Sequence, residues 1–258
     1  EIARELGGFT LAVESVAIYL GLHPDIRPAD YLARLRAEGL TGVDALPADA
    51  DVAAQMQHRE KQLRLVLDQT LARLTPPERT ALDYAALLPP DSIPWPWLRA
   101  LVEKDHTDEF AAGPGYPDPW PALRRRLEGL RLLTPGDHIE IARLHRMVTA
   151  HILWANQHAN VSLPTRAVQI APRFETSAVS FLKTRADFLW ENWEEPGIQW
   201  ELSPFMAFAW HWSQNKNAEW AFFANAAARI LHGLGRFEES ENLYRRIFQS
   251  INDGARTL

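Results

Sequence analysis

Apolar residues recur three and four positions apart along most of this chain, and the period changes to two only once. The helical spacing is clear in LRLVLDQTLARL (63–74) and in several segments after residue 180, whereas TLAVESVAIYLG (10–21) is apolar almost all round, as in a buried helix. Such spacing predicts amphipathic helices, whereas strict alternation predicts strands. The exception is RLLTPGDHIEIARL (131–144), two short extended runs around the turn sequence TPGD (134–137), which predicts a β-hairpin. The predicted fold class is therefore mainly α with one small β-hairpin.

Local signals place the ends of several helices. Thr75, Pro76 and Glu78 have the spacing of a capping box, with the proline at the first helical position. A short helix is expected to start near Pro96, and PALRRRLEGL (121–130) predicts another. Two stretches rich in small residues, Gly and Pro are expected to be irregular: 41–58 as a linker and 103–120 as a loop.

The composition is that of a folded globular protein, with 258 residues of which 47% are hydrophobic and 23% charged. The net charge of −6 argues against a protein that coats nucleic acid over its whole surface. Cysteine is absent, which excludes disulfides and fits a cytoplasmic protein. No apolar run reaches the roughly 18 residues of a membrane span, so no membrane contact is expected. Because the chain opens on Glu1 in the middle of a helical pattern, we expect it to be a segment of a longer protein.

Three helices followed by a hairpin is the order of a winged-helix domain, which we predict for residues 61–158. Residues 1–60 before it are predicted to form a helical subdomain and a linker. Residues 159–258 have a different composition, with most of the ten tryptophans and several helical segments joined by short breaks. This pattern is typical of stacked helical hairpins.

The last pair of segments resembles a tetratricopeptide repeat (TPR) over residues 221–254. Ser240 stands where the family usually has alanine, and Asn252 replaces its terminal proline. One detectable repeat implies neighbouring repeats that stabilise it. The resemblance assigns packing positions to Ala228, Gly235, Phe237, Ser240, Tyr244 and Ile247.

Two further motifs resemble those of the NB-ARC-type STAND NTPases. GGFTLAVESVAIYLG resembles the GxPLA helix of that family, with Gly8 and Leu11 matching and Thr10 in place of the usual proline. LHRMV resembles the histidine motif at the end of its winged helix, with His145 matching and Arg146 in place of the commoner aspartate. The order of GxPLA-like helix, winged helix, histidine motif and TPR agrees with a common architecture of such proteins.

The resemblance implies a regulatory and sensor segment. In this family the resting state holds ADP, the motif histidine reaches the β-phosphate, and exchange for ATP permits oligomerisation. The implied half site for ADP or ATP consists of Gly8, Thr10, Leu11, His145 and Arg146. The TPR-like helices are expected to bind a protein or peptide partner, and the intact protein is expected to self-associate.

ATP hydrolysis requires a P-loop, G-x-x-x-x-G-K-[ST], whose lysine reaches the β- and γ-phosphates. No lysine of this chain follows a glycine, and no Walker B strand is visible. The chain by itself is therefore not expected to be an enzyme. Any nucleotide it contacts is expected to bind mainly to residues outside this sequence.

DNA binding is the main alternative, as in a winged-helix transcriptional regulator with a helical interaction domain. Arg124, Arg125 and Arg126 lie on the candidate recognition helix, and residues 121–146 carry more arginines than acidic residues. Against this, three consecutive arginines point in different directions around a helix and form no single stripe.

Simpler interpretations exist for the other candidate residues. His145 can serve as a helix cap at a strand-to-helix junction, and the tryptophans of the C-terminal segments, such as Trp190 and Trp210, can be core residues rather than binding residues. No metal site is expected, because the histidines at 138, 145, 151 and 158 are six or seven positions apart and cannot pair on one helix face. No serine lies in a G-x-S-x-G motif, so no nucleophile of that type is expected.

Overall fold

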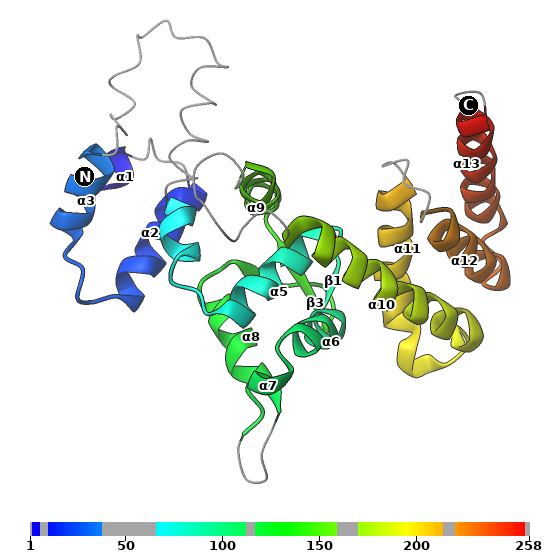
Figure 1. Cartoon of the computed structure of the whole chain (residues 1–258), viewed down its shortest axis with the longest axis horizontal. Helices are drawn as coiled ribbons and strands as arrows, with labels where there is room; N and C mark the ends of the chain where they lie inside the picture. Colours follow the sequence, from blue (N-terminus) through cyan, green and yellow to red (C-terminus); the bar gives the residue numbers. More distant parts are fainter. Residues whose placement is uncertain are drawn as a thin grey trace, which may run out of the picture. The chain divides into compact units, whose positions relative to one another are not determined.

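A computed structural model describes residues 2–5, 10–37, 66–111, 117–158, 170–213 and 220–255. Within these ranges the protein is mainly helical with one small antiparallel sheet, which confirms the predicted fold class (Figure 1). The chain divides into two compact units, each made of two segments. Unit 1 is Glu1–Arg79 with Asp118–Leu133, and unit 2 is Thr80–Pro117 with Thr134–Leu258. The predicted domain boundaries at residues 60 and 158 stay predictions, and the predicted linker 41–58 lies outside the described residues.

Unit 1 is built from helices. It contains α1 (Ile2–Glu5), α2 (Thr10–Leu22), α3 (Pro28–Ala37), a helical turn at 66–71 and α8 (Trp120–Gly129). The predicted helices at 10–21 and 121–130 are thus present, each with slightly shifted ends. The buried side chains of this unit include Val16, Tyr19, Tyr31, Leu67, Leu71 and Leu127.

Helix α5 (Pro76–Leu87) begins at the predicted capping box. The backbone N–H of Thr75 donates to Oε2 of Glu78 at 2.8 Å, and the carbonyl of Thr75 accepts the N–H of Arg79 at 2.9 Å. The first bond satisfies the N–H of Thr75, and the second is the first backbone hydrogen bond of the helix. The start of this helix is therefore encoded locally, as expected.

The sheet of unit 2 has one strand that the sequence did not reveal. The strands are β1 (Ile93–Pro94), β2 (Leu133–Pro135) and β3 (Ile141–Leu144), in the order β1-β3-β2. β1 pairs antiparallel with β3, and its last residue directly precedes α6 (Trp95–Asp105). The prediction that the hairpin is the only β structure was wrong, because a two-residue strand carries no period of its own and depends on its partner.

The hairpin also turns later than predicted. Thr134 and Pro135 belong to β2, and the turn spans 136–140. The N–H of Gly136 donates to the carbonyl of Ile141 at 2.8 Å and closes this turn. A Cβ at Gly136 would lie 2.9 Å from that same oxygen, so only glycine allows the close approach.

The stretch predicted as loop, 103–120, is partly helical. α6 continues to Asp105, and α7 (Thr107–Phe110) follows directly. His106 lies between the two helices, where its Nε2 is 2.9 Å from Oγ1 of Thr80 and its Nδ1 is 2.7 Å from Glu109. One local partner and one tertiary partner, Thr80, thus contact a polar segment that looks irregular in sequence.

The remaining helices of unit 2 are α9 (Arg146–His158), α10 (Ile170–Asn192), α11 (Gln199–Ser213), α12 (Trp220–Gly233) and α13 (Phe237–Ala255). α12 packs against α10, α11 and α13 (Figure 1). Aromatic rings fill this contact: Phe208 and Phe223 are fully buried and meet edge to face at 5.0 Å. The expected core role does not extend to Trp210, which is 40% exposed.

Candidate functional site

His145 lies between β3 and α9, at the junction that the sequence singled out. Its carbonyl accepts the N–H groups of Val148 and Thr149 at 2.8 and 3.0 Å, which begins the helix. Its ring Nδ1 accepts the N–H of Met147 at 3.2 Å. A side chain at the residue before a helix that accepts from the second helical N–H is an N-cap. The capping role considered for His145 is therefore present in the structure.

The cap occupies only one of the two ring nitrogens of His145. Because Nδ1 accepts a hydrogen bond, the proton of the neutral ring lies on Nε2, which makes Nε2 a donor. The side chain is exposed. The cap therefore leaves Nε2 of His145 unused.

Arg146 follows as the first residue of α9. Its guanidinium donates to Oδ2 of Asp91 at 3.0 Å, and the two side chains are 81% and 64% exposed. A surface ion pair of this kind contributes little to stability. A phosphate can therefore replace Asp91 as the partner of Arg146 with little loss of folding stability. Arg143 is engaged nearby with Asp137 at 2.6 Å.

The other residues of the predicted nucleotide half site are not described in enough detail to build a pocket. Gly8 lies outside the described residues. Thr10 begins α2 and Leu11 follows it, but the positions of their side chains are not described. His145 and Arg146 are therefore the part of the predicted half site with known geometry.

The three arginines of the DNA-binding alternative lie on α8 in different surroundings. Nε of Arg124 donates to Oε1 of Glu128 at 3.0 Å, Arg125 is exposed, and Arg126 is half-buried. This agrees with the expectation that consecutive arginines do not form one stripe.

The hairpin turn of unit 2 has an aromatic contact. The imidazole of His138 stacks on the indole of Trp200, with ring centres 5.0 Å apart and planes at 3°.

The TPR-like positions on α12 and α13 show a close helix–helix contact. Ala228 and Ser240 are buried, and Oγ of Ser240 donates to the carbonyl of Ala228 at 2.8 Å. Gly235 in the turn has a φ of 75°. Phe237 does not enter the core: it is 60% exposed and meets His232 edge to face. Tyr244 and Ile247 are half-buried.

A pocket that the sequence did not indicate lies between α11, α12 and α13. Its volume is about 390 Å³. Its lining is mostly apolar, and the residues that form it are Ser203, Met206, Ala207, Trp210, Leu231, Glu239, Asn242 and Leu243. The guanidinium of Arg246 lies 3.8 Å from the ring centre of Trp210. Periodicity alone does not reveal such a hollow, because it forms where three helices diverge.

A buried charge joins three helices of unit 2. Glu201 on α11 accepts two hydrogen bonds from the guanidinium of Arg185 on α10 and one from the indole N–H of Trp97 on α6. Its side chain is 3% exposed. A buried carboxylate persists only when it is paired and hydrogen-bonded. The network therefore connects the segment around β1 with the C-terminal helices.

The described part of the chain contains neither a cluster of metal-ligating side chains nor a membrane-spanning helix. Within it, no three His, Asp or Glu side chains are grouped so that they could hold a metal ion. None of its helices combines the length and the apolar character needed to cross a membrane.

No match is found by comparison of the chain with protein-family models, with curated proteins or with solved structures. A functional assignment therefore depends on the residues and contacts described above.

Proposed function

We propose that this chain is the regulatory and sensor segment of a cytoplasmic STAND-type NTPase. In this role the TPR-like helices recognise a protein or peptide partner, and the region around His145 responds to ADP or ATP held mainly by other parts of the intact protein. Partner binding then biases a nucleotide-dependent switch between a resting and a self-associating state. The observation that carries this proposal is the geometry of His145.

His145 fits the chemistry of a phosphate contact. The bond from Met147 to Nδ1 fixes the ring and leaves the exposed Nε2–H as a donor. Arg146 next to it adds a guanidinium whose present partner is an exposed aspartate. Bound ADP supplies a diphosphate anion, for which a fixed N–H donor and an arginine are suitable partners.

The buried contact at Glu201 supports the coupling that the proposal requires. Trp97 lies on α6, directly after β1, and β1 pairs with β3, which ends immediately before His145. Arg185 and Glu201 lie on α10 and α11, which pack against the TPR-like α12. A displacement of these helices therefore has a short, continuous path of buried contacts to the sheet.

Two variants of His145 separate its capping role from a nucleotide role. His145→Ala removes both the cap and the Nε2–H, whereas His145→Asn keeps a side-chain oxygen that caps a helix well. In the intact protein, ADP retained through gel filtration is measured after denaturation, and Tm is measured in parallel. We expect His145→Asn to keep the Tm of the parent but to lose ADP, and His145→Ala to lose both.

The opposite outcome is equally clear. If His145→Asn retains as much ADP as the parent protein, His145 is a cap only and the proposed role is wrong. A second check is independent of binding: the coding sequence upstream of Glu1 is expected to contain a P-loop, and its absence contradicts the assignment to this class.

A further inference from the structure

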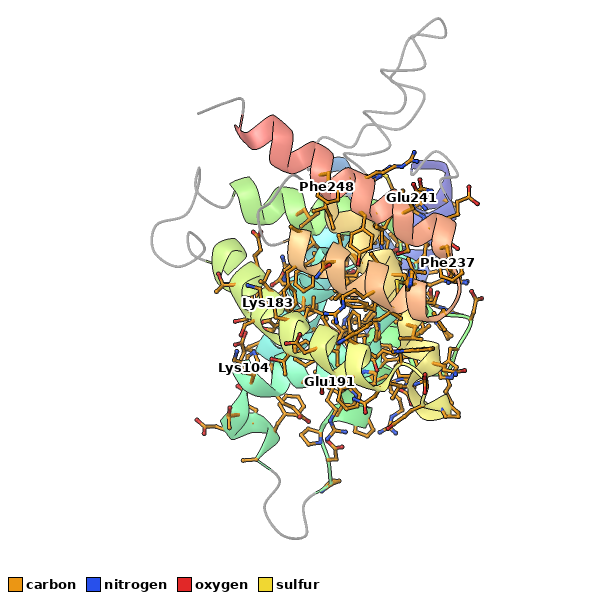
Figure 2. All side chains as sticks on the ribbon, turned by 90° about the vertical axis from the view of Figure 1, so that its right-hand side faces the viewer. Lys104, Lys183, Glu191, Phe237, Glu241 and Phe248 are labelled. Atoms are coloured by element: carbon orange, nitrogen blue, oxygen red, sulfur yellow. The ribbon has the colours of Figure 1, made fainter. Side chains whose placement is uncertain are left out.

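Helix α13 carries an exposed stripe of two phenylalanines and two charged residues. Phe237, Glu241, Arg245 and Phe248 are spaced by four, four and three residues. At about 100° per residue they fall within an arc of about 80° on one side of the helix. The phenyl rings are 60% and 65% exposed, and the two charged side chains 62% and 70%. Figure 2 shows Phe237, Glu241 and Phe248 spread along this helix.

The inner side of α13 is different. Ser240 and Leu243 are buried, and Ser240 bonds to the carbonyl of Ala228 on α12. The stripe therefore lies beside the packed face and not within it. Exposed phenylalanines at both of its ends are unusual for a surface that only meets water, because aromatic rings gain most from burial.

The stripe is complementary to its own reverse. Read from either end it begins and ends with phenylalanine, and reversal exchanges the positions of Glu241 and Arg245 to within one residue, about 1.5 Å along a helix. Such a pattern suits an isologous contact, in which the same surface of two copies meets around a two-fold axis.

We infer that α13 pairs antiparallel with α13 of a second copy of this chain. In this pair Phe237 of each copy lies against Phe248 of the other, and Glu241 of each copy meets Arg245 of the other. Glu241 and Arg245 already pair within one chain at 2.8 Å, so association exchanges this contact between copies and leaves no charge without a partner.

The size of the stripe predicts a weak dimer. Four partly exposed phenyl rings contribute about 400–600 Å². Stable interfaces bury about 1,200–2,000 Å² in total. We therefore expect a dissociation constant of about 10–100 µM for the dimer, rather than one in the nanomolar range. The contact involves no nucleotide, so it does not depend on the proposed function.

Sedimentation velocity of the full 258-residue chain, from about 2 to 200 µM in low salt, tests the pairing. The wild type is expected to shift from monomer to dimer with concentration, and Phe248→Ser is expected to stay monomeric. Glu241→Arg and Arg245→Glu each place like charges opposite one another across the two-fold axis, so each alone is expected to be monomeric. Mixed in equal amounts they are expected to associate, because every contact across the axis is then attractive.

Glu191→Arg is the matched control, because it reverses an exposed glutamate on α10, apart from α13 (Figure 2), and is expected to dimerise like the wild type. Circular dichroism checks that each variant keeps its helices. A wild type that stays monomeric at 200 µM overturns the inference. A mixture of the two charge variants that fails to associate, or a Phe248→Ser chain that still dimerises, overturns it as well.

Discussion

Arg185 on α10 donates two hydrogen bonds to Glu201 on α11, whose side chain is only 3% exposed. The indole N–H of Trp97 donates to the same carboxylate. Three side chains that are 16 to 104 positions apart in sequence thus meet at one carboxylate. Neither the identity of these residues nor their spacing in the sequence predicts this contact.

The first prediction concerns the two partners of this ion pair. Arg185→Ala leaves the carboxylate of Glu201 buried with one donor, which we expect to lower the free energy of unfolding by about 3 kcal/mol. Glu201→Gln removes the buried charge and keeps an acceptor for Trp97, and Arg185, 27% exposed, can turn to water. Its cost is expected to be about 1–2 kcal/mol. Urea unfolding followed by circular dichroism measures both, and a larger loss for Glu201→Gln than for Arg185→Ala would contradict this explanation.

The second prediction concerns the closest approach of α12 and α13. Ser240→Ala removes the bond to the carbonyl of Ala228 and is expected to cost about 1 kcal/mol of unfolding free energy. Ala228→Leu adds a large side chain where none of the surface is exposed, and is expected to cost about 3 kcal/mol or to separate the helices. Thermal unfolding compares the two. Equal, small effects would show that this contact is not tightly packed.

The third prediction separates backbone strain from lack of space in the turn between these helices. Gly235 has a φ of 75°, yet a Cβ there would meet no atom within 4 Å. Gly235→Ala is therefore expected to cost about 1 kcal/mol through the backbone alone. Gly197→Ala is a matched control, because that position is equally open and no positive φ is found there. The control is expected to change Tm little or to raise it.

The fourth prediction concerns pH. The pKa of His23 in unit 1 is lowered, first by burial and then by the positive charge of Arg73, with a further contribution from Arg126, while Asp25 opposes the shift. Because the folded state binds the proton more weakly than the unfolded state, the stability of unit 1 is fully present above about pH 6.5. It falls as the pH drops below 6.5 and levels off below the lowered pKa of the folded state.

Replacing His23 tests that dependence. His23→Gln is expected to flatten the loss of Tm between pH 7 and pH 5, with His232→Gln on α12 as the control. Arg73→Gln removes the largest electrostatic cause and is expected to weaken the pH dependence. A His23→Gln chain that loses as much Tm on acidification as the wild type would refute the assignment.

Local sequence signals were sufficient for several elements. The capping box at Thr75 works because all of its partners lie within four residues, and the helical periods of α12 and α13 reflect one buried face each. The TPR resemblance marked Ala228 and Ser240 as packing positions, and the structure joins them by a hydrogen bond from Oγ of Ser240 to the carbonyl of Ala228. These features depend on interactions that are short in sequence or repeat with a fixed period.

Other features depended on partners far along the chain. The two residues of β1 form a strand because β3 lies beside them, and His106, in the stretch expected to be a loop, contacts Thr80, which lies 26 positions earlier in the sequence. The sequence marked His145, but only the structure showed that its Nδ1 accepts the N–H of Met147 and caps α9. By itself, therefore, the sequence determined most of the helical segments and the position of the strand-to-helix junction at His145. The tertiary structure decided which polar groups are buried, paired or exposed, because those properties arise from segments that meet only in the folded chain.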